Sequence, residues 1–375
     1  GRVLRTMPLV FSPVNPRALF YATNVVWKTL NGGQSWTRIS PDLTRKDSIV
    51  PANVGKYSNQ PVTMARHKGV VYALAPPYVT ERWLWAGSVD GLIHVTKNGG
   101  ATWTDVTPPS LRAMPWAKVS IMDAGRFDSL TAYAAINSFR LDDLRPHLYA
   151  THDGGKTWKE INDGIPHGGI TNVIREDPVR RGLLFAGAEQ AVYYSMDDGA
   201  HWKSLRLNMP ATAIRDLIVK DNDVAVATHG RSFWILDDIT PLRQAPVDNV
   251  ARTYLYKPAQ AWRVRFNRWP DTPLPPDEPT ALNPPDGAVI DYSLDADATG
   301  PVVLEVLDSA GAIVRRYAST DSIEPMLSGT NVPSYWVRPQ QRLGTTAGHH
   351  RFVWDVHYPR PLGVSFDYPI SAAPL

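Results

Sequence analysis

One short motif occurs four times in this chain of 375 residues. Its copies read TLNGGQSW (29–36), TKNGGATW (96–103), THDGGKTW (151–158) and SMDDGAHW (195–202). Each copy places Asp or Asn, glycine and tryptophan at the same spacing. A unit that recurs at this scale is typical of a repeat architecture, in which every copy builds one module of the fold. The motif therefore predicts a repeat protein and a structural role for its own residues.

The chemistry of the motif predicts a hairpin turn between two strands. Asp153 can accept hydrogen bonds from nearby backbone N–H groups, and glycine adopts positive φ without a Cβ clash. The tryptophan that follows starts the outgoing strand and offers a large apolar face to a neighbouring module. The predicted structural residues of the four copies are Asn31, Trp36, Asn98, Trp103, Asp153, Trp158, Asp197 and Trp202.

The spacing of the copies and the composition together predict an all-β fold. Successive motif tryptophans lie 67, 55 and 44 positions apart, and the shortest interval approximates a four-stranded propeller blade of about 40 to 50 residues. The chain contains 13 Trp, 33 Pro and 26 Gly, which favours short strands joined by turns. We expect about five blades within residues 1–240.

The motif resembles the Asp box, or bacterial neuraminidase repeat, of sialidases, xyloglucan-cleaving propeller hydrolases and sortilin-type receptors. Longer runs, including SFRLDDLRPHLYATHDGGKTW and ATHGRSFWILDD, resemble secreted bacterial proteins described as glycosyl-hydrolase-like or sortilin-like repeat proteins. The resemblance implies that the box lies on a turn at the outer edge of each blade. It also implies a secreted, periplasmic or cell-surface location, and further blades upstream that would complete the ring, so we expect a C-terminal fragment.

Two further regions are expected after the blades. Residues 241–285 read as a linker, because eight prolines lie between Pro258 and Pro285 and proline cannot donate to a sheet ladder. Residues 286–375 contain segments that alternate apolar and polar residues at strand period. They predict an immunoglobulin-like or fibronectin-like β-sandwich, truncated at its C-terminus.

Charge and composition argue against several kinds of site. The formal net charge is only +3, and no run of about five or six like charges occurs, so nucleic acid is not an expected partner. Cysteine is absent, and the histidines lack metal-site spacing. No apolar run is long enough for a transmembrane helix. We expect neither a metal nor another cofactor.

Catalytic residues cannot be assigned from the sequence, although candidates for a carboxylate pair exist. Hydrolysis of a glycoside needs two carboxylates that face one cleft. The candidates are Asp90, Asp142, Asp143, Glu176, Asp177 and Glu189. For each of them we favour a role as a turn or cap residue over a catalytic one. Sialidase chemistry would need an arginine cluster and a tyrosine nucleophile supported by a glutamate. Arginines are available at Arg140, Arg145, Arg175 and Arg231, but the sequence around them does not resemble a sialidase, so we do not expect this activity.

Two segments are candidates for ligand binding. The loop SFRLDDLRPH supplies Arg140, Asp142, Asp143 and Arg145, and ATHGRSFW supplies His229 and Arg231. Either segment could grip a polar ligand or brace the neighbouring structure through internal pairs. Aromatic residues that could stack on sugars are Trp83, Trp85, Trp234, Trp262 and Trp269.

These features favour an extracellular binding or scaffolding propeller that contacts a protein or a glycan. The first alternative is a glycoside hydrolase with a carboxylate pair. The second alternative is a structural subunit of a larger surface assembly, which would bury blade edges or the sandwich against partners.

Overall fold

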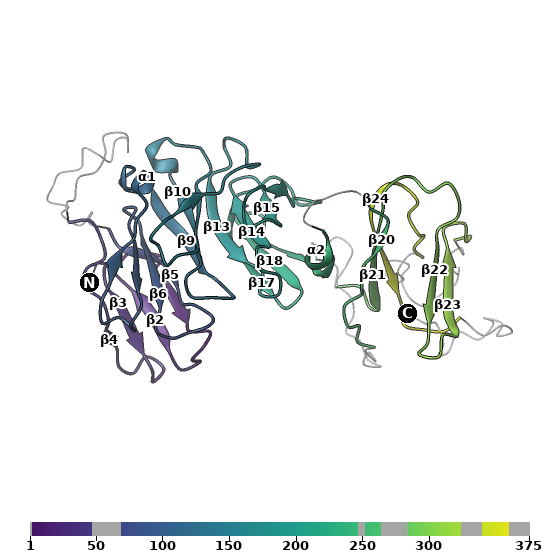
Figure 1. The fold of residues 1–375 in the computed structure, drawn as a ribbon, viewed down its shortest axis with the longest axis horizontal. Coiled ribbons are helices and arrows are strands. Elements are labelled where there is room, and N and C mark those ends of the chain that lie inside the picture. Colours follow the sequence, from purple (N-terminus) through teal and green to yellow (C-terminus); the bar gives the residue numbers. More distant parts are fainter. Residues whose placement is uncertain are drawn as a thin grey trace. The chain divides into compact units, whose positions relative to one another are not determined.

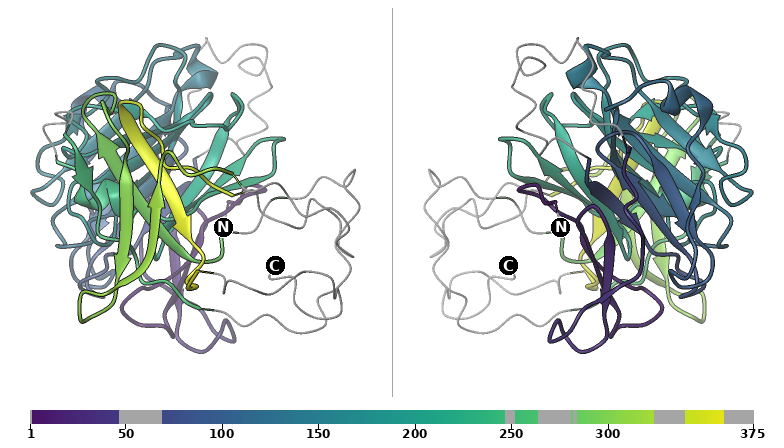
Figure 2. Two further views of the ribbon diagram at one scale, coloured as in Figure 1. Left: turned by 90° about the vertical axis from the view of Figure 1, so that its right-hand side faces the viewer. Right: turned by 90° about the vertical axis from the view of Figure 1, so that its left-hand side faces the viewer.

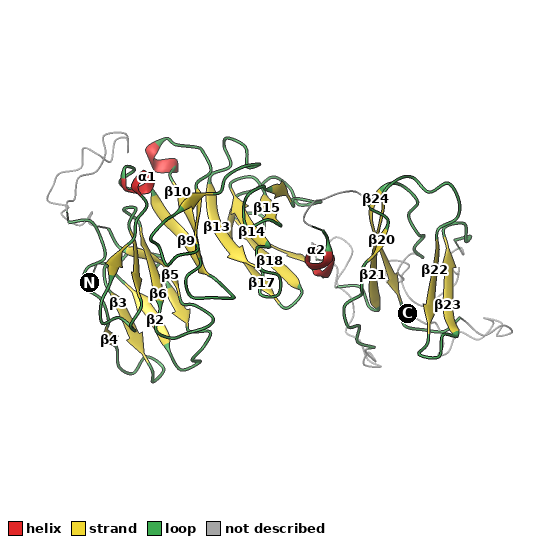
Figure 3. Cartoon of the chain, viewed as in Figure 1, coloured by secondary structure: helices red, strands yellow, loops and turns green. Residues whose placement is uncertain are grey.

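The computed structural model describes residues 2–46, 69–246, 252–263, 281, 284–323 and 340–359. The chain divides into two units, Gly1–Asp237 and Asp238–Leu375. Strands dominate both units (Figures 1 and 3). Helical turns of the described residues are α1 (Pro109–Arg112), α2 (Thr240–Gln244) and the 3-10 turn η2 (Phe139–Leu141). None of them approaches the length that a bilayer crossing needs.

The first unit consists of antiparallel sheets that follow one another along the chain (Figures 1 and 2). Blade 1 contains β1 (Leu9–Phe11), β2 (Leu19–Ala22), β3 (Val26–Thr29) and β4 (Thr37–Arg38). Blade 2 contains β5 (Val71–Ala75), β6 (Leu84–Ser88), β7 (Ile93–Thr96) and β8 (Thr104–Asp105). Blade 3 contains β9 (Lys118–Ala124), β10 (Ala132–Asn137), β11 (Leu148–Thr151) and β12 (Lys159–Glu160).

Blade 4 contains β13 (Thr171–Glu176), β14 (Leu184–Ala188), β15 (Val192–Ser195) and β16 (Lys203–Ser204). Blade 5 contains three strands within the described residues, β17 (Ile214–Lys220), β18 (Asp223–Thr228) and β19 (Phe233–Leu236). Each sheet pairs its strands in chain order, which is the up-and-down arrangement of a β-propeller blade. The first unit is therefore built as a β-propeller.

The repeated motif forms the turn between the third and fourth strands of blades 1 to 4. In blade 3, Thr151 Oγ1 donates to Asp153 Oδ1 (2.9 Å) and accepts the Gly155 N–H (3.1 Å). Asp153 Oδ1 also accepts the Thr157 N–H at 2.9 Å. Gly155 has a φ of 84°, which a residue with a Cβ adopts only with strain.

The copies with asparagine form the same turn. Asn98 Oδ1 accepts the Thr102 N–H at 2.9 Å, and its amide nitrogen donates to Thr102 Oγ1 at 2.9 Å. Asn31 makes the equivalent bonds with Ser35, and Asp197 accepts the His201 N–H at 2.9 Å. One oxygen at this position accepts the backbone N–H four residues later, and an amide supplies that oxygen as well as a carboxylate does.

The motif tryptophans join each blade to the preceding one. In blades 2 to 4 the indole N–H donates to the backbone carbonyl of the residue that follows the fourth strand of the previous blade. The pairs are Trp103 to Ile39 (2.7 Å), Trp158 to Val106 (2.8 Å) and Trp202 to Ile161 (2.6 Å). For the Trp36 indole, the described residues provide no such carbonyl partner.

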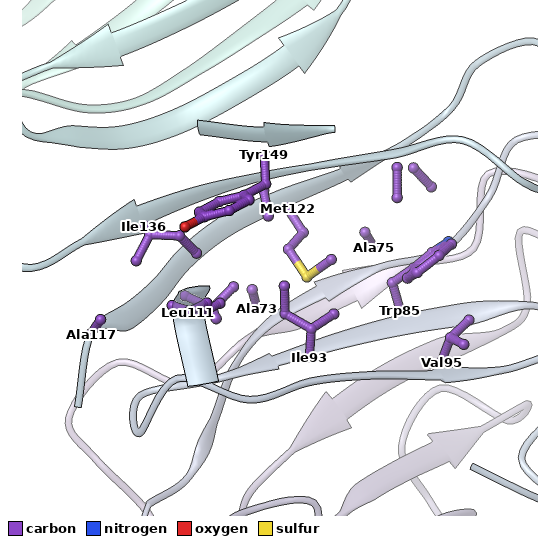
Figure 4. Packing of buried hydrophobic residues seen from close by; sticks show 14 residues of the cluster. Ala73, Ala75, Trp85, Ile93, Val95, Leu111, Ala117, Met122, Ile136 and Tyr149 are labelled. Atoms are coloured by element: carbon purple, nitrogen blue, oxygen red, sulfur yellow. The ribbon is translucent and has the colours of Figure 1, made fainter. Parts of the chain in front are cut away.

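The apolar core lies between consecutive blades. Figure 4 shows Trp85 and Ile93 of blade 2 in the same buried cluster as Met122 and Tyr149 of blade 3. A glycine in the second strand allows a close approach to the next blade. A Cβ on Gly187 would lie 2.5 Å from Ile214 and 2.6 Å from Val173.

The second unit contains two small antiparallel sheets. One sheet has the order β20 (Tyr254–Leu255), β21 (Ala288–Leu294) and β24 (Gly348–Trp354), and the other pairs β22 (Val303–Leu307) with β23 (Ile313–Ala318). Tyr292, Leu343 and Phe352 form its buried cluster. Asp291 is buried and accepts a hydrogen bond from the guanidinium of Arg351 at 3.0 Å.

The expected linker, residues 241–285, contains regular structure in its described part. Helix α2 ends within it, and β20 pairs with β21 of the second unit. The predicted sandwich strands correspond to β21 to β24. The immunoglobulin-like fold of residues 286–375 stays a prediction, and the end of that region, 360–375, lies outside the described residues.

Candidate functional site

The first strands of blades 2 to 5 bring polar side chains together at their N-terminal ends. Strand β5 contacts β9, β9 contacts β13, and β13 contacts β17. The first or second residues of these strands are Tyr72, Lys118, Asn172 and Arg215. Together with Asn137, Glu189 and His229 they form a group that we name the mouth cluster.

A chain of hydrogen bonds within the mouth cluster crosses three blades. The Asn137 amide donates to Asn172 Oδ1 (2.6 Å), and the Asn172 amide donates to Glu189 Oε1 (3.1 Å). Arg215 Nη1 donates to the same carboxylate at 2.9 Å, while Arg215 Nε donates to His229 Nδ1 at 3.3 Å. These bonds fix the Glu189 carboxylate between an amide and a guanidinium, so its negative charge is already engaged.

Lys118 is the cation of this cluster without a carboxylate partner. Its ammonium lies 4.4 Å from the centre of the Tyr72 ring, a cation–π contact. Within the described ranges, no carboxylate lies at ion-pair distance from it. Burial, together with the like charges of Arg140 and Arg215, lowers the pKa of Lys118 to about 8, and the charge of Glu189 offsets only part of this effect. A partly desolvated ammonium beside other cations attracts an anion.

The SFRLDDLRPH loop divides into a paired part and an open part. Asp143 accepts two hydrogen bonds from Arg145, at 2.9 and 2.8 Å, and lies 2.9 Å from His147 Nε2. The Arg145 guanidinium and His147 hold the pKa of Asp143 well below its usual range. Asp142 is exposed with a φ of 59°. Arg140 is exposed and its charge acts on Lys118, so it is the residue of this loop that influences the mouth cluster electrostatically.

The segment around Gly230 lies at the edge of the same cluster. His229 accepts the hydrogen bond from Arg215 described above. The Arg231 N–H donates to Thr228 Oγ1 (3.0 Å), and its carbonyl accepts the Trp234 indole N–H (2.9 Å). Arg231 itself is an exposed residue. Of this predicted pair, His229 is therefore the residue within the hydrogen-bond network.

Three of the candidate carboxylates accept hydrogen bonds from backbone N–H groups. Asp90 is buried and accepts the Arg45 N–H (2.9 Å) and the Ser88 hydroxyl. Asp177 accepts the N–H groups of Val179 and Arg180 in a turn. Glu176 Oε2 accepts the Arg126 N–H at 2.8 Å.

Sequence reasoning missed a second carboxylate beside Glu176. Asp123 Oδ2 accepts the Glu176 N–H at 2.9 Å, and both side chains are buried. Burial raises the pKa of each carboxyl above its usual value. Arg175 donates to the carbonyls of Met122 (3.1 Å) and Leu217 (3.0 Å) and to Asp216 (3.0 Å). It therefore ties β9, β13 and β17 together.

The candidate aromatic residues belong to both units and do not form one group along the chain. Trp83 lies 6.1 Å, ring to ring, from the buried Trp85. Trp234 is in blade 5, and Trp262 is exposed in the second unit. Trp269 lies outside the described residues. Within the described part of the chain, no group of three His, Asp or Glu side chains has the arrangement of a metal site.

The comparisons give a structural likeness and no family. No family model matches the sequence, and no curated protein matches it. A GH74 xyloglucanase from Xanthomonas campestris is 11% identical over 60% of this chain and 35% of its own, with a TM-score of 0.42. An ancestral GH74 enzyme is 14% identical over 87% and 39%, with a TM-score of 0.42.

A third similar structure is the extracellular domain of a putative hybrid two-component system from B. thetaiotaomicron. It is 13% identical over 62% of this chain and 26% of its own, with a TM-score of 0.41. The chain thus spans well under two thirds of the length of these proteins. Identity and TM-scores at this level transfer no activity to it.

Proposed function

We propose that this chain is a binding or scaffolding propeller that takes a carboxylate-bearing ligand, from a protein or a glycan, at the mouth cluster. The observation that carries the proposal is Lys118, whose ammonium is partly buried, faces Tyr72 and is repelled by Arg140 and Arg215. The Glu189 carboxylate of the cluster is bonded to Asn172 and Arg215, so a bound carboxylate would give Lys118 a charge-assisted hydrogen bond of its own. A location outside the cytoplasm stays a prediction of the sequence resemblance.

The proposal is tested by binding to acidic probes. An oligoglutamate peptide and a uronic-acid oligosaccharide are titrated calorimetrically into the protein, each with its uncharged counterpart as a control. We expect the Lys118→Gln variant to bind the preferred probe at least about tenfold more weakly, a loss of ~1.4 kcal/mol. Lys203→Gln changes an exposed lysine of β16 outside the mouth cluster and should leave affinity unchanged. Equal affinities for the two variants would contradict the proposal.

The second candidate function, glycoside hydrolysis, is supported by Asp123 and Glu176. The Asp123 carboxylate accepts the backbone N–H of Glu176, and both carboxyls have raised pKa values, as the acid of a catalytic pair would. However, backbone N–H groups engage both, and both are buried. Hydrolysis of a polysaccharide such as xyloglucan that is abolished in a folded Glu176→Gln variant would favour the enzyme over the binding propeller.

A further inference from the structure

The joint between blades recurs with the same contacts along the first unit. After each fourth strand, the backbone N–H of one residue donates to the first residue of the third strand. These donors are Ile39, Val106, Ile161 and Leu205, and their acceptors are Val26, Ile93, Leu148 and Val192, at 2.8 to 2.9 Å. The carbonyls of the first three donors accept the indoles of Trp103, Trp158 and Trp202. Leu205 holds the fourth position of this series.

Glycine completes each joint. In every copy of the motif a glycine lies three residues before the tryptophan. A Cβ there would press on the residue whose carbonyl accepts the indole: Gly100 on Ile39, Gly155 on Val106 and Gly199 on Ile161. The sequence that contacts the preceding blade is therefore Gly-x-x-Trp. The two residues after the tryptophan form the fourth strand, and an aliphatic residue follows them.

The joint at Leu205 lacks the tryptophan that the other three joints have, as far as the described residues show. Leu205 lines a groove together with Val192, Leu207, Met209, Val226 and Trp234. The groove lies between the end of blade 4 and strands β18 and β19 of blade 5. Within the described ranges, no tryptophan donates to the Leu205 carbonyl.

Among the strands that the structure describes, β19 is correspondingly an exposed edge. It pairs with β18 on one side, whereas β3, β7, β11 and β15 each pair with two strands. Phe233, the first residue of β19, is 80% exposed, and Ile235 is 62% exposed. The first residues of the other third strands are at most 2% exposed; they are Val26, Ile93, Leu148 and Val192. An apolar, unpaired edge is a template for another strand.

We propose that the β19 edge and the groove beside Leu205 bind an extended polypeptide segment of the form Gly-x-x-Trp-x-x-aliphatic. The segment adds the fourth strand of blade 5. Its indole N–H donates to the Leu205 carbonyl, its glycine packs on the Leu205 side chain, and the N–H of its aliphatic residue donates to the Phe233 carbonyl. This surface continues the three described joints and is independent of the mouth cluster.

The probe is a fluorescent peptide with the sequence GGKTWKEI, which copies residues 154–161 of this chain. Its binding to the whole protein is followed by fluorescence anisotropy. We expect saturable binding, and at least about tenfold weaker binding when Ala replaces the peptide's tryptophan, since a buried tryptophan is a typical hot spot. Hydrogen exchange of residues 233–236 should slow when the peptide binds.

Protein variants locate the binding site. The double variant Phe233→Lys/Ile235→Lys places charge on the exposed edge and should weaken binding at least about tenfold. Phe11→Lys alters an equally exposed apolar residue of β1 and should bind as the wild type does. Equal affinity for the two peptides, or for the double variant and the wild type, would overturn the proposal. Dimerisation that the double variant abolishes would instead assign the edge to a second copy of the chain.

Discussion

The indole N–H of Trp158 lies 2.8 Å from the carbonyl oxygen of Val106, a residue of the preceding blade that is 52 positions earlier in the sequence. The same relationship joins Trp103 to Ile39 and Trp202 to Ile161. In each case the repeated motif closes its own hairpin and then reaches across to the neighbouring blade. One sequence element thus determines both the turn within a blade and the joint between blades.

Loss of this joint should be measurable with a conservative change. Trp158→Phe keeps an aromatic ring but removes the donor to Val106, and a partly buried carbonyl without its partner costs about 1–2 kcal/mol. Urea unfolding should show this loss. Trp262→Phe changes a tryptophan of the second unit that is exposed, so it should leave the free energy of unfolding of the first unit unchanged. A Trp158→Phe protein as stable as the wild type would refute the structural role of the indole bond.

Gly187 should tolerate no side chain. Its Cβ would lie 2.5 Å from Ile214 of blade 5 and 2.6 Å from Val173 of blade 4, so Gly187→Ala should cost about 1–3 kcal/mol by overpacking. Thermal unfolding gives the measurement. Gly300→Ala is the matched control, because its Cβ would meet nothing within 4 Å. Equal losses for the two variants would mean that the blades are not packed as closely as described.

Arg175 should stabilise the first unit through its three acceptors on β9 and β17. Lysine keeps the charge but cannot donate in three directions from a planar group. Arg175→Lys should therefore lower the free energy of unfolding by about 2 kcal/mol. Arg231→Lys, at an exposed arginine, serves as the control in chemical denaturation. If both variants unfold at the same denaturant concentration, Arg175 does not tie the strands together.

The motifs of blades 3 and 4 should make stability depend on pH. His152 Nε2 lies 2.7 Å from Asp198 Oδ2, and this carboxylate raises the pKa of His152 above its usual value. Because the folded state favours the protonated imidazole, the contribution is complete below about pH 6.5, the ordinary histidine pKa. It disappears as the pH rises through the higher pKa of the folded state.

The comparison of wild type with His152→Gln isolates this contribution. The stability difference between the two proteins should be largest at about pH 5.5 and should shrink towards about pH 8.5. Urea unfolding at both pH values provides the test. A difference that stays constant, or that grows with pH, would show that His152 does not pair with Asp198.

The sequence predicted local features better than long-range ones. The turn chemistry of Asp153 and the glycines depends on neighbours within a few residues, so the hairpins could be placed correctly. Lys118, Asn172 and Arg215 were missed, because they converge only when the first strands of successive blades lie side by side. The signal that could have found them is a polar residue at the start of each apolar first strand, as in KVSIMDA, TNVIRE and IRDLIVK.

Other differences have similar reasons. Strand β20 is only two residues long, so periodicity cannot detect it. The carboxylate of Asp123 contacts the backbone of Glu176, 53 residues away, which no local pattern indicates. Pairing of Arg145 with Asp143 could be predicted from their closeness in sequence, whereas the effect of Arg140 on Lys118 could not.

The ionisation of Lys118 tests the proposed function most directly. Its side-chain pKa can be measured by NMR titration of lysine labelled with ¹³C and ¹⁵N, with assignment by the Lys118→Gln variant. We expect a pKa of about 8 in the free protein, and a rise towards the ordinary value of about 10.5 when a carboxylate-bearing ligand binds. A pKa near 10.5 in the free protein, or one that ligand binding leaves unchanged, would contradict the account of the mouth cluster as an anion-binding site.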